Sequence, residues 1–421
     1  MSVKISQLDN GLQVVTDPMD GVQSTALGLW FKVGARYETA NLSGIAHFIE
    51  HMLFKGTDRR SSFAVSEEIE ATGGFLNAYT SRENTAFYAR MLSQDTALCL
   101  DVLADILQHS RFDSEDIERE QTVISQEIAQ ADDAPDDVVF TDFQSQAFAG
   151  QGLGQSVLGT QQTLSNINRD NAMAFWRHHY RPDKAVLVAS GDVKHDDLVR
   201  MAERLFWPDR GERGPREMPA AASYTGGVTL KNRALEQVHT VLGFEGASVT
   251  DARFFASAVL STLLGGGSSS RLFQEVREKR GLAYHVGAHT SGYADTGLFA
   301  VYAGTAPEAE AELLGVLIDE FKRLADTKVP EDEIERAQAQ IRASVLMGRE
   351  STSSRAEDAA QQMLVYGIPR SVSDLIGQLN AVDADAIRQE AQTMLASPVT
   401  LSAVGPLSDT DSLYEIDQRL R

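Results

Sequence analysis

Two histidines and a glutamate lie within five consecutive residues, His47-Phe48-Ile49-Glu50-His51. Ser43 is a suitable N-cap and Gly56 a suitable C′ residue, so the sequence predicts a helix of about three turns between them. Because residues four apart lie one turn apart on a helix, the two imidazoles share one face. This spacing places two nitrogen atoms where both could bind one metal ion. Glu50 lies close enough to act on a water molecule at such a metal without being a ligand.

The remaining residues of this helix are mostly apolar, which predicts that it is buried nearly all round. They are Ile45, Phe48, Ile49, Met52 and Leu53. Histidines and carboxylates inside a buried helix need partners, because an unpaired buried polar group is costly. One interpretation is an ordinary pair of hydrogen-bonded core histidines. A metal site requires a third ligand from elsewhere in the chain.

A second acidic helix, predicted over residues 112–128, offers that ligand. Its apolar stripe is formed by Ile117, Ile124 and Ile128, and Glu120 and Glu127 fall on this same stripe. A carboxylate on the buried side of a helix usually has a charged partner or a metal. We therefore predict Glu127 as the third metal ligand, and Glu120 as a residue that holds a ligand histidine from behind.

Length and composition favour a soluble globular protein of two domains, since the chain has 421 residues. No apolar run reaches the roughly 20 residues of a membrane span, and the first residues lack a signal-peptide pattern. We expect a cytoplasmic protein. Cys99 is the single cysteine, so a metal site must use histidine and carboxylate ligands. Its apolar neighbours predict a buried, inert thiol.

The formal net charge of -22 argues against a nucleic-acid-binding role, because phosphates require a basic surface. The same charge suits attraction of basic peptides. An acidic surface that only keeps the protein soluble explains it equally well.

The order of predicted elements indicates a duplicated chain. The one long Pro/Gly/Ala-rich stretch, residues 208–222, marks the boundary, so we predict domains at 1–208 and 226–421 joined by a linker at 209–225. In both halves strands precede a helix that ends in a glycine turn, then a hairpin, a helix and an acidic-capped helix.

The repeat allows the two halves to be compared position by position. The segment 116–119 recurs as 333–336, with Ile117 matching Ile334. Adding the same offset, 334 minus 117 or 217 residues, takes the five candidate site residues to positions in the second half. His47, Glu50, His51, Glu120 and Glu127 correspond in this order to Leu264, Gly267, Ser268, Ala337 and Ser344. The second half keeps the frame and has lost every candidate ligand, which favours a chemical role for the set in the first half.

The second half has its own feature, the run Gly265-Gly266-Gly267 followed by three serines. It is not a phosphate-binding P-loop, because no Gly-Lys-Ser/Thr ending follows. Two interpretations stay open. The glycines cap one helix and let the next pack closely, or they face a substrate.

Together these residues resemble the inverted-zincin peptidases of the pitrilysin and mitochondrial processing peptidase family, most closely its bacterial members of similar length. The resemblance rests on His47-Phe48-Ile49-Glu50-His51, on Glu127, on Gly74-Phe75-Leu76-Asn77-Ala78, and on Arg277 with Tyr284. It implies an α+β fold of two homologous domains of the LuxS/processing-peptidase-like metallohydrolase type. Each domain would be a mostly antiparallel sheet packed against helices, and two chains would form a clamshell dimer around a closed chamber.

The resemblance also implies roles for individual residues. His47, His51 and Glu127 would bind one Zn²⁺ per chain, and Glu50 would be the general base. Arg277 and Tyr284 would hydrogen-bond to the carbonyl or oxyanion oxygen of the substrate.

The same resemblance implies how a peptide is bound. Asn77 and Ala78 would offer a strand edge to an extended peptide, and Gly265, Gly266 and Gly267 would contact substrate. Because one chain carries both the zinc motif and the glycine loop, we predict a homodimer or a self-sufficient subunit.

Three functions are compatible with this pattern. The first is a zinc endopeptidase acting on peptides, including basic ones, with no nucleic-acid or membrane partner. The second is a non-catalytic core subunit of the same fold. The third is a metal-dependent hydrolase of a substrate other than a peptide. The intact set of His47, Glu50, His51 and Glu127 favours the first.

Overall fold

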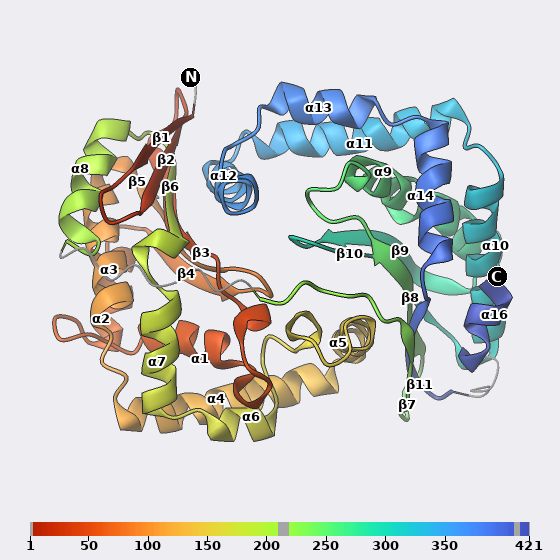
Figure 1. Ribbon diagram of the computed structural model, residues 1–421, viewed down its shortest axis with the longest axis horizontal. Helices are drawn as coiled ribbons and strands as arrows, with labels where there is room; N and C mark the ends of the chain where they lie inside the picture. Colours follow the sequence, from red (N-terminus) through yellow and green to blue (C-terminus); the bar gives the residue numbers. More distant parts are fainter. Residues whose placement is uncertain (1–2, 209–218, 408–412, 421) are drawn as a thin grey trace. The chain divides into compact units, whose positions relative to one another are not determined.

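The protein consists of two compact units (Figure 1), described in a computed structural model over residues 3–208, 219–407 and 413–420. Unit 1 comprises Met1–Ala129, Gln155–Pro219 and Met347–Pro369. Unit 2 comprises Gln130–Gly154, Ala220–Leu346 and Arg370–Arg421. The units therefore do not follow a single cut at the predicted linker 209–225, of which residues 209–218 lie outside the described part of the chain.

Two helices explain why one cut does not separate the units. Helix α5 (Pro135–Ala147), from the first half of the chain, packs its apolar face on Val241, Leu298 and Val404 of the second-half sheet. Helix α12 (Thr352–Tyr366), from the second half, packs on Val15, Trp30, Val186 and other residues of the first-half sheet. The two halves thus exchange one helix each. Burial of apolar side chains on both sheets stabilises this arrangement.

Unit 1 is built on a six-stranded sheet of order β1-β2-β6-β3-β5-β4. Its strands are β1 (Lys4–Gln7), β2 (Gln13–Pro18), β3 (Ser24–Phe31), β4 (Phe75–Thr80), β5 (Thr85–Leu92) and β6 (Ala185–Gly191). Only β2 and β6 run parallel, and the other neighbours are antiparallel. Strand β4 lies at one edge, where it pairs with β5.

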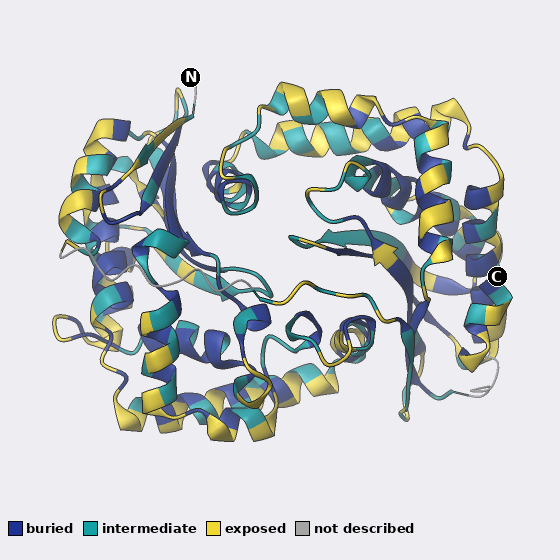
Figure 2. Ribbon diagram, viewed as in Figure 1, coloured by how far each residue is buried: buried dark blue, intermediate teal, exposed yellow. Residues whose placement is uncertain are grey.

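One face of this sheet carries the main core of unit 1. The helices of the unit before α12 are α1 (Ile45–Leu53), α2 (Ser62–Glu70), α3 (Thr96–His109), α4 (Ser114–Asp133), α6 (Gln161–Asn166), α7 (Arg169–His179) and α8 (His195–Leu205). Buried residues of β2, β3, β5 and β6 join those of α1, α3 and α8 in one cluster. Figure 2 shows the same division, with buried strands and helices that expose one side. Helix α12 covers the opposite face.

Unit 2 repeats this plan with five strands in the order β7-β11-β8-β10-β9. They are β7 (Gly227–Asn232), β8 (Val238–Gly246), β9 (Ala283–Gly292), β10 (Gly297–Thr305) and β11 (Thr400–Gly405). The order matches β2-β6-β3-β5-β4, and the single parallel pair, β7 with β11, falls at the same place. The predicted α+β fold of two homologous domains is confirmed.

The helices of unit 2 complete the repeat. Besides α5 they are α9 (Phe254–Gly265), α10 (Glu310–Asp326), α11 (Glu331–Gly348), α13 (Val372–Asn380), α14 (Ala384–Ala396) and α16 (Ile416–Leu420), with a π-helical segment η6 (Phe273–Glu278). Helix α11 is the counterpart of α4 in the predicted alignment, with Ala337 and Ser344 where α4 has Glu120 and Glu127. The frame is therefore kept without the carboxylates.

Two further expectations concern single features of the chain. Cys99 is buried in α3, and burial together with the nearby charge of Asp95 raises the pKa of its thiol to about 12, as an inert thiol requires. In the described residues, the length and apolarity needed to cross a bilayer are not combined in any one helix.

Candidate metal centre

Helix α1 begins one residue later than its sequence predicts, and with a different cap. Its N-cap is Gly44, which adopts a left-handed backbone with φ of 93°. A Cβ at this position would lie 2.7 Å from the carbonyl oxygen of Leu158, so glycine is required on two grounds. The Ser43 hydroxyl donates instead to the carbonyl oxygen of Ser156.

The cap of α1 is supplied by Glu38. Its carboxylate accepts hydrogen bonds from the backbone N–H of Gly44 at 2.7 Å and of Ala46 at 2.8 Å. Burial raises the pKa of Glu38 to about 8, against the opposing effect of these two hydrogen bonds. Glu38 was not among the predicted residues, because it lies six residues before Gly44 and outside the local N-cap pattern.

The end of α1 lies close to the predicted stop. The helix ends at Leu53 with Phe54 as its C-cap, and Gly56 follows with a φ of 115°. Ile45, Phe48, Ile49, Met52 and Leu53 are all buried, as their spacing predicts. The apolar faces of α1 therefore fix the helix in the core and leave its histidine face for chemistry.

Three candidate ligands converge beside α1. The carboxylate oxygen Oε2 of Glu127 lies 3.7 Å from Nε2 of His47 and 3.7 Å from Nε2 of His51. The two imidazole rings are 4.6 Å apart between centroids, as the four-residue spacing requires. One ligand atom from each residue lies within 4.8 Å of the others. Sequence positions about eighty residues apart are thus brought to one point by the packing of α4 on α1.

The donor set fits Zn²⁺. Zinc takes imidazole nitrogen and carboxylate oxygen at about 2.0–2.2 Å in tetrahedral geometry, which places ligand atoms a little over 3 Å apart. The Glu127 oxygen lies 3.7 Å from each histidine nitrogen, so these distances need to shorten only slightly to reach that geometry. The side chains are 12%, 20% and 37% exposed for His47, His51 and Glu127, so one side of the cluster faces solvent. A fourth position is therefore accessible to water or substrate.

Glu120 holds one of the two histidines. Its Oε2 lies 2.9 Å from Nδ1 of His51, and its Oε1 lies 2.6 Å from the ammonium group of Lys55. The Glu120 side chain is only 5% exposed. A hydrogen bond at Nδ1 fixes the ring so that Nε2 faces Glu127. By contrast, Nδ1 of His47 is buried and has no hydrogen-bond partner among the described residues.

The two histidines differ in their electrostatics. Burial, helped by the charge of His51, lowers the pKa of His47 to about 4, which keeps this ring neutral. Burial alone would also lower the pKa of His51. The hydrogen bond to Glu120 and the charges of Glu127, Glu120 and Glu50 outweigh it, so the pKa of His51 rises above its ordinary value of 6.5. His47 is ready to bind a metal, whereas His51 must release a proton.

Glu50 lies beside this cluster but is not one of the three candidate ligands. Its carboxylate accepts a hydrogen bond of 2.5 Å from the hydroxyl of Thr80 on β4. Burial raises the pKa of Glu50, the Thr80 hydrogen bond and His51 oppose the rise, and the charge of Glu127 adds to it. A carboxylate with a raised pKa is a better proton acceptor, as a general base requires. Thr80 was not among the predicted site residues, although it is three residues beyond Asn77.

Asn77 and Ala78 lie in the middle of the edge strand β4. Asn77 is exposed and Ala78 half-buried. Among the described strands β4 pairs only with β5, so its other backbone edge is unpaired with a strand, and there the N–H of Ala78 donates to Oδ1 of Asn77 at 2.9 Å. Their predicted contact with a peptide backbone is compatible with this position.

The remaining predicted site residues belong to unit 2. The guanidinium of Arg277 lies 4.5 Å from the centroid of the Tyr284 ring and 4.7 Å from that of Phe273. Tyr284 is 79% exposed at the start of β9. The predicted pair thus lies together, with its phenol accessible to solvent.

Two of the three glycines have a packing explanation. A Cβ at Gly265 would lie 2.1 Å from the backbone nitrogen of Ala288, and one at Gly266 would lie 2.7 Å from Cα of Thr262. Gly265 lets the end of α9 approach β9, whereas Gly266 avoids a clash with the preceding turn of α9 itself. A Cβ at Gly267 would meet only the side-chain oxygen of Gln340 at 3.8 Å, so substrate contact stays a prediction for this position.

Comparison with known proteins identifies the family. Residues 13–161 match the model of "Insulinase (Peptidase family M16)", and residues 166–341 match that of "Peptidase M16 inactive domain". The chain belongs to peptidase family M16. The second description agrees with the second half's lack of the ligand residues.

Relatives and solved structures support the same assignment. The chain is 40% identical over 415 residues to an uncharacterized zinc protease of Streptomyces coelicolor, covering 97% of this chain and 90% of that protein. It is 36% identical over 430 residues to a probable mitochondrial-processing peptidase subunit beta of Arabidopsis thaliana, covering 99% and 81%. The crystal structure of a protease from Helicobacter pylori shares the fold, with a TM-score of 0.89 at 21% identity over 96% of this chain and 99% of that one. The predicted family, enzyme class and zinc cofactor are confirmed.

We predict that zinc binding depends on the three converging residues and on Glu120. His47→Ala, His51→Ala and Glu127→Ala should each lose the single zinc per chain after dialysis, because a tetrahedral site cannot be completed. Glu120→Gln should keep the metal with an affinity about 10-fold to 100-fold lower. Competition titration with a chelator measures both effects. Glu118→Gln, an exposed change on the same helix, is the matched control; equal weakening by the control would contradict the assignment.

The pKa of His51 predicts how zinc binding responds to pH. Below that raised pKa the ring is protonated, so the zinc dissociation constant should increase by about 10-fold for each unit of falling pH. His47 adds a second proton only near pH 4. In Glu120→Gln the pKa of His51 falls, so the weakening should begin at a lower pH. Identical pH profiles for the parent and the variant would contradict this account.

Proposed function

We propose that this protein is a zinc-dependent endopeptidase that hydrolyses peptides or short unfolded segments inside a closed chamber. The observation that carries the proposal is the convergence of His47, His51 and Glu127, with Glu50 held beside them by Thr80. A ligand set with a buried base next to it is the arrangement that peptide hydrolysis by a metallopeptidase requires.

Each residue has a part in the proposed reaction. Zinc, when bound, supplies Lewis acidity to the scissile carbonyl and to a water molecule. Glu50 accepts a proton from the attacking water and later donates it to the leaving amine. The open edge of β4 at Asn77 and Ala78 orients the peptide backbone through main-chain hydrogen bonds, which selects little by sequence.

Arg277 and Tyr284 are proposed to stabilise the oxygen that becomes negatively charged. A phenol and a guanidinium are both donors of the kind that an oxyanion needs. Their stacking supports a shared role, because the guanidinium over the Tyr284 ring restrains both side chains. Gly267 is proposed to contact substrate beside them.

We also propose a homodimer that acts in the cytoplasm. One chain carries both the ligand set and the glycine loop, so no different subunit is needed to supply either. The net charge of -22 favours peptides that carry basic residues. A sedimentation measurement that finds an inactive monomer, activated only by a different chain, would contradict the homodimer.

A non-catalytic core subunit of the same fold is the alternative. A solved complex III from Candida albicans contains a chain of this fold, at 19% identity and a TM-score of 0.87, so the fold alone does not imply catalysis. The converging ligand atoms favour the enzyme, because a scaffold has no need to keep them.

We predict that Glu50→Gln separates metal binding from catalysis. Glutamine keeps the size of the side chain and its hydrogen bond to Thr80 but cannot accept a proton. Peptide hydrolysis should fall by at least about 1,000-fold while one zinc per chain remains. Digestion of a peptide library, with and without chelator, measures the activity.

The control for this experiment is Glu67→Gln, an exposed change on α2. It should leave both zinc content and cleavage at the parent level. Cleavage by Glu50→Gln at the parent rate would refute the assigned base, and absence of peptide cleavage by the parent would favour the scaffold or a substrate of another class.

The role of Tyr284 predicts a loss confined to the chemical step. Tyr284→Phe removes only the hydroxyl, so kcat should fall by about 100-fold with zinc content unchanged. Tyr414→Phe, at another exposed tyrosine, is the control. A fall in kcat no greater than that of the control would remove Tyr284 from the mechanism.

A further inference from the structure

Strand β4 connects the proposed base to the opposite face of its sheet. Side chains alternate along a strand, so Ala78 and Thr80 face α1 while Tyr79 faces α12. Thr80 donates to Glu50 on the first face. Because β4 is an edge strand with β5 as its neighbour, its backbone hydrogen bonds restrain it from one side. Its remaining restraint must come from side chains.

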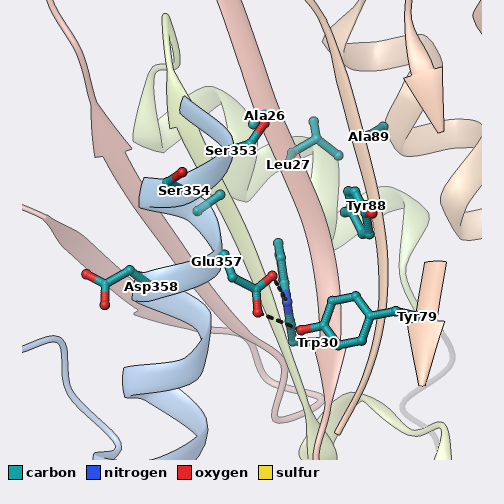
Figure 3. Close-up of a pocket in the computed structure, with 11 residues that line it drawn as sticks. Ala26, Leu27, Trp30, Tyr79, Tyr88, Ala89, Ser353, Ser354, Glu357 and Asp358 are labelled. Carbon is teal, nitrogen blue, oxygen red and sulfur yellow. Dashed lines mark hydrogen bonds between the residues drawn. The ribbon is translucent and has the colours of Figure 1, made fainter. Parts of the chain in front are cut away.

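On the α12 face, Tyr79 is bound by a carboxylate (Figure 3). The hydroxyl of Tyr79 donates to Oε1 of Glu357 at 2.6 Å, and the indole N–H of Trp30 donates to Oε2 at 3.0 Å. Burial and the neighbouring charge of Glu357 raise the pKa of Tyr79, so this hydroxyl stays protonated and able to donate. Glu357 therefore joins the edge strand β4 to the central strand β3.

Gln361, one turn further along α12, supports the same contact. Its amide N–H donates to Oε1 of Glu357 at 2.8 Å and to the hydroxyl of Tyr79 at 3.1 Å. Its amide oxygen accepts from Asn84, in the turn between β4 and β5, at 3.1 Å. The hairpin that carries Thr80 is thus held by α12 at two points.

Apolar packing is incomplete at this place, so the hydrogen bonds carry the restraint. A cavity of about 420 Å³ lies between α12 and the sheet, lined by Trp30, Tyr79, Tyr88, Ser353, Glu357 and neighbouring residues. A close-packed interface would fix β4 by contact alone. Here the Glu357 carboxylate spans part of the gap between the helix and Tyr79.

Helix α12 is itself firmly mounted on the sheet. Asp17, which is 1% exposed, accepts hydrogen bonds of 2.7 Å from Arg349 and of 2.7 Å from Nε of Arg355. Buried alanines of α12 and Met363 pack on the strands beyond. The helix is also the part of the second half that belongs to unit 1, since residues 220–346 and 370–421 belong to unit 2.

We propose that Tyr79 and Glu357 are positioning residues for the general base. They hold β4 against α12 so that the Thr80 hydroxyl stays within hydrogen-bond distance of Glu50. When this contact is lost, β4 moves relative to α1, the Thr80 hydrogen bond lengthens and the Glu50 carboxylate turns away from its working orientation. The proposal rests on the proposed peptidase function, and it gives α12, from the second half of the chain, an influence on the base through Tyr79 and Thr80.

The test compares two ways of breaking the contact. Tyr79→Phe removes the donor and keeps the ring, and Glu357→Ala removes the acceptor. Glu357→Gln is the conservative variant, since its amide oxygen still accepts from Tyr79. Asp358→Asn removes a charge from the next residue of α12 and is the matched control. Asp358 is 46% exposed, and its partners are Arg349 at 3.7 Å and Gln362, not Tyr79 or Trp30.

Three measurements distinguish positioning from a general loss of structure. In Tyr79→Phe and Glu357→Ala, kcat should fall by about 10-fold to 100-fold, while zinc affinity stays within about twofold of the parent. Amide hydrogen exchange should accelerate by about 10-fold in β4 and stay unchanged in β1, the opposite edge strand. Glu357→Gln should recover most of the kcat. Adding Thr80→Val to Tyr79→Phe should lower kcat little further, because both changes act on one contact with Glu50.

The outcomes decide the proposal without depending on peptide cleavage alone. Exchange is measured on the zinc-loaded Glu50→Gln protein without substrate, so its result stands even if the parent cleaves no peptide, which would instead refute the proposed function. If Tyr79→Phe folds and shows the parent's exchange in β4, the proposal is wrong. It is equally wrong if kcat is unchanged, or if Tyr79→Phe and Thr80→Val have multiplicative effects on kcat. Should Glu357→Ala fail to fold, Tyr79→Phe decides the matter.

Discussion

The structure depends on the packing of one buried helix, α1, against the acidic helix α4. Two imidazoles four residues apart offer only two ligands. Glu127 completes a candidate metal site, because its Oε2 lies 3.7 Å from Nε2 of both histidines. The apolar residues of α1 and the isoleucines of α4 drive that approach, because each helix buries its stripe in the same core. The cost of burying histidines and carboxylates is offset only where they find partners. For His51 and Glu120, the hydrogen bonds that satisfy the buried groups also fix the geometry of the candidate site.

The duplicated fold shows which parts of this constraint are structural and which are chemical. Unit 2 keeps the strand order, the parallel pair and a helix equivalent to α4, but it has alanine and serine where α4 has Glu120 and Glu127. The frame does not need the charged residues in order to fold. Their presence in unit 1 alone indicates a function beyond stability. Because α5 and α12 are exchanged between the halves of the chain, each unit contains a segment from both halves.

Much of the site could be predicted from sequence because its signals are local. Helix periodicity alone shows that His47 and His51 share one face. It also places Glu120 and Glu127 on an apolar stripe. Other features depend on contacts between distant residues, for which a sequence pattern gives no sign. Glu38 caps α1 from before the preceding turn. The apolar faces of α5 and α12 predict that these helices are buried, but they do not specify on which sheet. The predicted linker 209–225 therefore contains the unit boundary at Pro219 and Ala220, but the exchanged segments 130–154 and 347–369 were not predicted.

The central claim is that a single zinc ion binds between α1 and α4, and diffraction measured at the zinc absorption edge from crystals of the zinc-loaded Glu50→Gln protein tests it most directly. The account predicts one anomalous peak per chain, about 2.0–2.2 Å from Nε2 of His47, Nε2 of His51 and a carboxylate oxygen of Glu127. A peak at any other place, or a Glu127 side chain directed into solvent with zinc held by the histidines alone, would contradict it.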